Sequence, residues 1–164
     1  MDYKKLEDKL KLKELELNSV LEITNAINDN LPEPALYKIY DFTLRATLNV
    51  KKLVLFVLDE NWSCKVQHNT EVDYFKVKLD EELTQLKTIT EVKNCKNKLF
   101  KEFEYIIPVF HKQRTLALVF VSEDRDNEHN ASEFIQALSN IIIVAIENKK
   151  LARRELDQES FRKE

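Results

Sequence analysis

The sequence of 164 residues contains no glycine. Glycine-rich phosphate loops, the dinucleotide-binding fingerprint and the nucleophile elbow of hydrolases all depend on glycine, because they need tight turns and close approach of the backbone. The lack of glycine therefore excludes all three motifs. It also leaves the tight turns to asparagine and aspartate, which tolerate a left-handed backbone better than other side chains do.

Cysteine, long apolar runs and blocks of one charge are also scarce. Cys64 and Cys95 stand in no metal or redox motif, and the N-terminus has no signal peptide, so we expect reduced thiols and a cytoplasmic location. No apolar run approaches the ~20 residues that cross a bilayer, which argues against membrane insertion. The net charge of −3 is spread along the chain, which argues against nucleic acid as a partner.

Groups that could bind a metal or catalyse a reaction do not cluster in the sequence. His68, His111 and His129 lack the close-spaced ligands of a zinc site, so we expect neither a metal nor a cofactor. Asp59 and Glu60, like the other acidic pairs, fall at predicted turns, and turn formation accounts for them. We therefore expect this chain by itself to be no enzyme.

A predicted hairpin lies at the centre of the chain. Leu53–Leu58 is an unbroken apolar run, which predicts a strand that is covered on both faces. After a turn, Trp62, Cys64 and Val66 alternate with polar residues, which predicts a returning strand with one buried face. Residues 115–121 form a second unbroken apolar run, and we expect it to lie beside Leu53–Leu58.

The patterns between these two apolar strands are weaker. Phe75, Val77 and Leu79 alternate with polar residues and predict a third strand. Asp80 is the expected N-cap of a short helix. Pro108 indicates an edge or the end of a strand. The remaining predicted strands are residues 88–92 and 103–109.

Three longer helices are predicted around the strands. Residues 3–28 contain no helix breaker and carry an interrupted heptad pattern, which favours pairing with another helix over a solvated single helix. Pro34 suits the first turn of a second helix with one apolar face. Asn130 and Glu133 predict the capped start of the last helix, which becomes charged from Glu147 onward.

The order of these elements predicts the fold class. Hairpin connections are too short for crossovers, so the sheet must be largely antiparallel. The three longer helices would cover one face of it, with the two terminal helices side by side. The predicted class is α+β with long N-terminal and C-terminal helices. Because the chain ends within a helical pattern, we expect it to be part of a longer protein.

Several stretches, taken in order, resemble a GAF domain over residues 20–151. They are LEITNAINDN with LYKIYDFTL ahead of VKKLVLFVLDE, then YIIPVFHKQRTLALVFVSE, then the closing helix FIQALSNIIIVAIENKKLARREL. The resemblance implies a GAF-like domain at residues 18–150. It also implies a coiled-coil-like helix at 1–17 before this domain and the start of a linker helix at 151–164 after it.

The tail ENKKLARRELDQESFRKE is similar to the linker that precedes the catalytic module of bacterial sigma-regulatory serine phosphatases of the PPM class. This resemblance implies an attached C-terminal effector, such as a serine phosphatase. We therefore predict a non-catalytic regulatory domain that forms a homodimer and couples the binding of a small molecule or a partner to that effector. The chain lacks the cyclic-nucleotide signature and the cysteine–histidine pair of the bilin-binding members.

Two alternatives stay open. One is an enzyme on a GAF-like fold, redox-active at Cys95, because Lys93, Lys96 and Lys98 could lower the pKa of the thiol. The other is a degenerate module that only dimerises, with its pocket filled by bulky side chains.

Two sets of candidate residues follow from these predictions. The expected ligand pocket comprises Phe56, Cys64, Phe75, Tyr105 and Phe110. The expected dimer helices carry Leu6, Leu10, Leu17, Val20, Ile142, Ala145, Ala152 and Leu156. Both helices are expected to leave the domain on one side, and Lys13 and Lys149 interrupt their apolar stripes, so that replacing both by leucine should lock the dimer.

Overall fold

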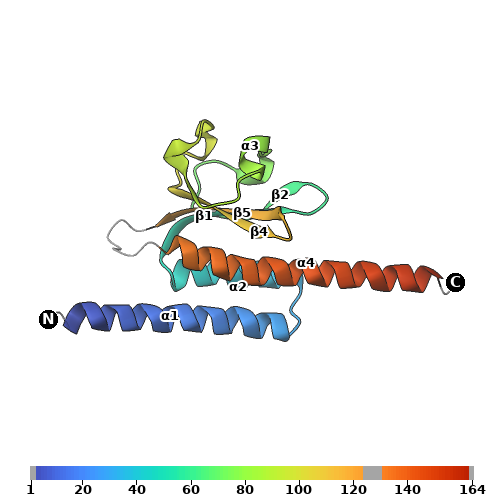
Figure 1. The fold of residues 1–164 in the computed structure, drawn as a ribbon, viewed down its shortest axis with the longest axis horizontal. Helices are drawn as coiled ribbons and strands as arrows, with labels where there is room; N and C mark the ends of the chain where they lie inside the picture. Colours follow the sequence, from blue (N-terminus) through green and yellow to red (C-terminus); the bar gives the residue numbers. More distant parts are fainter. Residues whose placement is uncertain (1–2, 124–130, 163–164) are drawn as a thin grey trace.

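The computed structural model describes residues 3–123 and 131–162 of the chain. The fold is α+β and is built on an antiparallel five-stranded sheet with the strand order β2-β1-β5-β4-β3. Figure 1 shows its layers: residues 69–104, here called the roof, lie over one face of the sheet, and two helices lie against the other face. No helix within the described ranges is long and apolar enough to cross a bilayer.

The sheet confirms the predicted central strands. β1 (Val50–Leu58) pairs with β2 (Trp62–His68) on one side and with β5 (Arg114–Glu123) on the other. β5 pairs in turn with β4 (Tyr105–His111), and the two-residue β3 (Thr90–Glu91) lies at the edge. Every pair is antiparallel, and short hairpins join β1 to β2 and β4 to β5.

A bulge in β2 changes which face its side chains occupy. Leu55 lies opposite Val66 and Phe56 lies opposite Cys64, so Lys65 is an extra residue in the ladder. Because side chains alternate along a strand, the extra residue places Val66 on the helix side of the sheet and Cys64 on the roof side. The prediction of one common buried face for these two residues is therefore wrong.

The sheet separates two hydrophobic cores, as the prediction of strands covered on both faces requires. Leu53, Leu55 and Val57 of β1 pack on the helix side, and Val54 and Phe56 pack on the roof side. All five side chains are almost fully buried. This double cover accounts for the unbroken apolar run in the sequence.

The long helices form two further layers. α2 (Glu33–Ala46) and α4 (Ser132–Arg162) lie on the sheet, and α1 (Tyr3–Asn28) packs against these helices on the side away from the sheet. Strands spaced about 4.8 Å apart offer four long strands room for only two helices about 10 Å apart. The prediction that all three helices cover the sheet is therefore wrong for α1. The predicted cap Asn130 lies outside the described residues.

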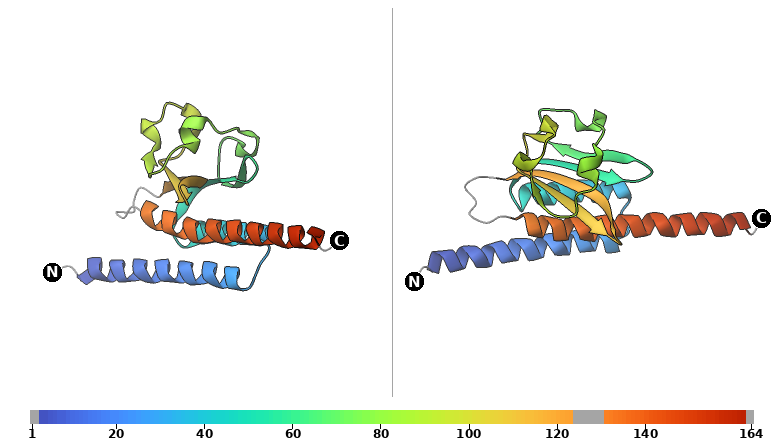
Figure 2. Two further views of the ribbon diagram at one scale, coloured as in Figure 1. Left: turned by 45° about the vertical axis from the view of Figure 1, so that its right-hand side comes forward. Right: turned by 45° about the horizontal axis from the view of Figure 1, so that its top comes forward.

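α1 and α4 run in the same direction, and they project beyond the domain at opposite ends. The N-terminal part of α1 extends past one end, and the C-terminal part of α4 extends past the other, in every view of Figures 1 and 2. The expectation that both helices leave the domain on one side is therefore wrong. The chain enters the domain at one end and leaves it at the other.

The turns show how a chain without glycine reverses direction. Asn30, Asn49 and Asn69 take positive φ values of 56–57°, as the sequence led us to expect. Lys112 and Gln113, with φ values of 50° and 65°, form the two-residue turn between β4 and β5. That turn type normally takes asparagine or glycine, so this hairpin holds two unfavourable residues in a left-handed conformation.

The roof contains short helices where a third strand was predicted. Tyr74–Lys76 forms a 3₁₀ helix, η1, because the Asp73 carboxylate accepts a hydrogen bond from the Phe75 N–H and caps it. Tyr74 is buried and Phe75 is exposed, so the strand prediction is wrong. The predicted short helix after Asp80 is confirmed as α3 (Glu81–Thr84). The remaining roof helices are η2 (Val92–Asn94) and η3 (Lys98–Phe100).

Candidate functional site

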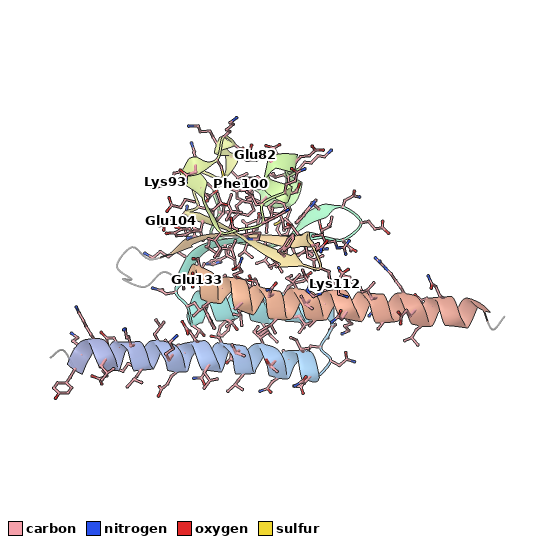
Figure 3. All side chains as sticks on the ribbon, in the orientation of Figure 1. Glu82, Lys93, Phe100, Glu104, Lys112 and Glu133 are labelled. Carbon is pink, nitrogen blue, oxygen red and sulfur yellow. The ribbon has the colours of Figure 1, made fainter. Side chains whose placement is uncertain are left out.

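The space between sheet and roof is filled by aromatic rings. Phe100 of η3 lies between Phe120 and Tyr74, with ring centroids 4.1 Å and 5.2 Å apart and interplanar angles of 13° and 16°. Phe56 and Phe103 contact the same stack with tilted or edge-on rings. Figure 3 shows Phe100 within the roof, above the sheet, whereas Glu82 and Lys93 of the same segment are exposed. Rings stacked at this distance leave no room for another planar molecule between them.

A buried carboxylate ties the roof to the start of β1. Glu102, whose side chain is only 6% exposed, accepts a hydrogen bond of 2.6 Å from the Tyr74 hydroxyl and one of 3.0 Å from the Glu71 N–H. Lys52 Nζ lies 3.3 Å from its Oε1. Burial alone would raise the pKa of Glu102, but the hydrogen bonds from Tyr74, Glu71 and Lys52 outweigh it, and the pKa is lowered. Burial, and then Glu102 itself, raises the pKa of Tyr74.

Replacing Glu102 by glutamine should therefore change how stability depends on pH. A carboxylate whose pKa is lowered by folding adds stability above its ordinary pKa of 4.5, and that stability is lost as the pH falls through the lower folded value. We expect the free energy of unfolding of E102Q to be roughly 1–3 kcal/mol lower than that of the wild type at neutral pH. Below pH 4.5, where the wild type loses the contribution of the carboxylate, the stability of E102Q should depend less on pH. Urea unfolding between about pH 3 and pH 7 measures both effects. The control is E104Q, and equal pH slopes for the two variants would contradict the expectation.

The residues predicted for the ligand pocket lie in several places. Phe56 and Cys64 meet in the roof-side core. Phe75 is 57% exposed and lines a shallow groove beside α2. Tyr105 lines a cavity at the start of β4, and the ring of Phe110 lies 6.0 Å from Lys87 Nζ. The structure therefore brings together only two of the five.

Sequence reasoning missed three rings that carry the aromatic stack, namely Tyr74, Phe100 and Phe120. Phe120 could have been found, because it alternates with the neighbours that face the helices within the apolar run of β5. Phe100 has no periodic neighbours. The Asn97 side chain places it by accepting a hydrogen bond from the Leu99 N–H at the start of η3.

Cys95 lines a surface cavity of about 640 Å³ between the roof and β4, together with lysines and glutamates. Lys93 in this cavity pairs with Glu91 at 3.0 Å. Burial, and then the charge of Glu82, raises the pKa of the Cys95 thiol, which is the opposite of the lowering that the neighbouring lysines could have caused. The raised pKa removes the basis for an activated thiol at this position.

The surroundings of Cys64 also disfavour the thiolate form. It is 9% exposed, and burial raises its pKa to about 12. Its Sγ donates to the Val66 carbonyl oxygen at 3.3 Å, within its own strand. Within residues 3–123 and 131–162, no three histidine, cysteine or acidic side chains gather into a group that could hold a metal ion.

α1 has apolar residues on two opposite faces. One face packs against α2 and α4 through Ile23 and Ala26, which are at most 4% exposed. With about 3.6 residues per turn, the exposed apolar residues of α1 fall mainly on the opposite face. We call this face the outer stripe: Tyr3, Leu6, Leu10, Leu17 and Leu21, with exposed fractions of 74%, 57%, 60%, 60% and 49%.

The other residues predicted for dimer contacts are divided between core and surface. Val20 and Ala145 are half-buried, and Ile142 is fully buried in the helix-side core. The remaining two, Ala152 and Leu156, are exposed on the projecting part of α4. Lys149, expected to interrupt the stripe on α4, donates instead to the Leu31 carbonyl oxygen at 2.8 Å. Its replacement by leucine would therefore remove a contact within the chain.

Comparison with known proteins identifies the fold. The sequence matches no family model and no curated protein. The structure is similar to the GAF domain of a protein described as a sensor histidine kinase from Pseudomonas syringae pv. tomato, with a TM-score of 0.64 and 12% identity over 95% of this chain and 98% of that one. It is also similar to a fragment of a methyl-accepting chemotaxis protein, with a TM-score of 0.59 and 14% identity over 82% of this chain and 99% of that one. The chain therefore has the GAF fold.

Proposed function

We propose that this chain is a dimerising regulatory domain of a signalling protein. In this proposal the outer stripe of α1 pairs in parallel with the outer stripe of a second copy, and α4 continues to an attached effector. The observation that supports it best is the exposed apolar stripe opposite a face that is already buried. A surface helix normally has one apolar face, so the second needs its own partner.

The spacing of the outer stripe supports a two-stranded coiled coil. Tyr3, Leu10 and Leu17 follow one another at intervals of seven residues and occupy a positions, and Leu6 occupies a d position. In a parallel pair with this register, Lys9 at a g position faces Glu14 at an e position of the second chain. These opposite charges favour the parallel orientation.

The direction of the helices suggests how this dimer would transmit a signal. α1 and α4 run in the same direction and project at opposite ends of the domain. A parallel pair of α1 helices would therefore bring both copies of α4 out at the same end, where two attached effectors would meet. A partner that prefers one arrangement of the pair would shift the arrangement of the effectors.

The filled aromatic core favours a protein partner, or the dimer arrangement itself, over a small molecule between sheet and roof as the input. It also favours a second candidate function, a module that only dimerises. The two similar structures described above come from proteins whose names describe signalling, a sensor histidine kinase and a chemotaxis protein. For the effector we propose a serine phosphatase of the PPM class, on the resemblance of the tail alone.

Light scattering on these 164 residues alone, without an effector, over a range of concentrations tests the dimer. We expect a mass of twice 19.4 kDa, falling toward the monomer on dilution. A monomer at on the order of 100 µM would overturn the proposed function, because a pair weaker than that could not hold two effectors together.

A further inference from the structure

The contacts of α4 with the rest of the domain change from apolar to polar where the helix leaves the sheet. Ile146, 3% exposed, is the last residue of α4 in the helix-side core. The side chains of residues 151–158 are all exposed. We call residues 147–158 the exit half of α4. Hydrogen bonds and ion pairs, rather than buried apolar side chains, therefore hold this half to the domain.

The polar contacts converge on the turn of the β1–β2 hairpin. Lys150 Nζ lies 3.6 Å from Asp59 Oδ2 and 3.5 Å from Glu33 Oε1. Arg154 Nη2 lies 3.8 Å from Asp59 Oδ1. Glu33, at the start of α2, also accepts a hydrogen bond of 3.1 Å from the Tyr37 hydroxyl. Asp59 thus connects the sheet to two successive turns of α4.

Two further contacts flank this cluster. Arg114, beside the β4–β5 turn, lies 3.0 Å from Glu147, and Lys149 donates to the Leu31 carbonyl oxygen at 2.8 Å. These contacts hold the first turn of the exit half. Asp59 reaches along the helix as far as Arg154, and it directly follows the end of β1.

We propose that Asp59, Lys150 and Arg154 form a polar latch that sets the position of the exit half of α4 relative to the sheet. Opening the latch frees the exit half while the helix-side core stays intact. β1 carries Lys52, the partner of Glu102 in the roof, near its start, and Asp59 follows its end. A shift of the roof or the hairpin thereby reaches α4. The role in signalling rests on the proposed function, whereas the latch itself does not.

The strength of the latch suits a reversible change. Asp59 and Arg154 are 41% and 59% exposed, and such ion pairs are individually weak. Lys150 is more enclosed, at 17% exposure, and serves two carboxylates. Weak pairs of this kind change the ratio of open to closed latch by small factors only, so a partner that prefers one position of the helix can shift the equilibrium.

Hydrogen exchange of the backbone amides in D59N tests the latch in the whole chain. We expect exchange in residues 147–154 to become roughly threefold to tenfold faster, while exchange in β1 and β5 stays unchanged. K150M keeps the apolar stem of the side chain and should give a similar increase, and the double variant should add little to either. The control is E60Q, which removes a neighbouring carboxylate of the same turn.

Hydrogen exchange at raised salt concentration is a second test of the latch. Raised sodium chloride should speed exchange in residues 147–154 of the wild type more than in D59N, because D59N has already lost the Asp59 pairs and keeps only Lys150–Glu33 and Arg114–Glu147 for salt to screen. Unchanged exchange in D59N and K150M would overturn the latch, and so would an equal increase throughout the chain. Light scattering on the same samples separates the two proposals, because a monomer with the D59N effect contradicts only the proposed dimer.

Discussion

Truncating Phe100 to alanine should destabilise the protein by about 3–5 kcal/mol. The ring is 2% exposed and stacks on both Phe120 and Tyr74, so its removal leaves a cavity in the roof-side core. Neighbouring rings held by strands and by the Glu102 hydrogen bond can close this cavity only in part. Urea unfolding at constant protein concentration, followed by the fluorescence of Trp62, measures the loss.

Leu99 offers a matched control in the same short helix. It precedes Phe100 and is 39% exposed, so L99A should stay within about 0.5 kcal/mol of the wild type. If F100A and L99A cost the same, Phe100 is no part of a packed core, and the stack is contradicted. The comparison separates burial of the side chain from any general sensitivity of η3.

Ligand binding to F100A also tests whether the wild-type domain has space for a small molecule between sheet and roof. A dry cavity lined by aromatic and aliphatic side chains can bind benzene. We expect benzene or indole to raise the stability of F100A and to leave that of the wild type unchanged. Stabilisation of the wild type by the same compounds would show space between sheet and roof, and would restore a small molecule as the input.

The sequence predicted the parts of the fold that depend on regular patterns. Leu53–Leu58 and residues 115–121 were identified as neighbouring strands because burial on both faces leaves no polar position. The bulge at Lys65 could not be seen in the sequence. One extra residue moves the neighbouring side chains to the other face of the sheet, but the pattern of polar and apolar residues stays the same. The 3₁₀ helix at Tyr74 is capped by a hydrogen bond from the Phe75 N–H to the Asp73 carboxylate, and the alternating pattern of the sequence did not reveal this bond.

Candidate site residues could be predicted from the sequence only where the spacing of apolar residues along a helix shows which side chains are exposed. The heptad pattern of α1 found Leu6, Leu10 and Leu17, which are exposed. It also included Val20, which packs on the helix-side core, because a helix with two apolar faces satisfies more than one spacing. The latch could not be predicted, because it joins the β1–β2 turn to α4, and these two elements are distant in the sequence.

Introducing lysine at Leu10 and Leu17 together should raise the dissociation constant of the dimer by on the order of 100-fold or more. Each chain would lose two apolar contacts from the seam and place like charges opposite one another. Both side chains are 60% exposed within one chain, so the change should leave the fold of the monomer intact. Sedimentation or light scattering over a range of concentrations measures the constant, and circular dichroism checks the fold.

The same substitution at Leu15 provides the control, because this residue is exposed on α1 but lies far around the helix from the outer stripe. L15K should dimerise like the wild type, whereas K13L, which fills the gap in the stripe, should dimerise more tightly. Lys13 pairs with Glu16 at 3.4 Å on the surface, and the loss of such an exposed pair costs little. If L15K weakens the dimer as much as the double variant does, the contact lies elsewhere on α1, and the proposed parallel seam is wrong.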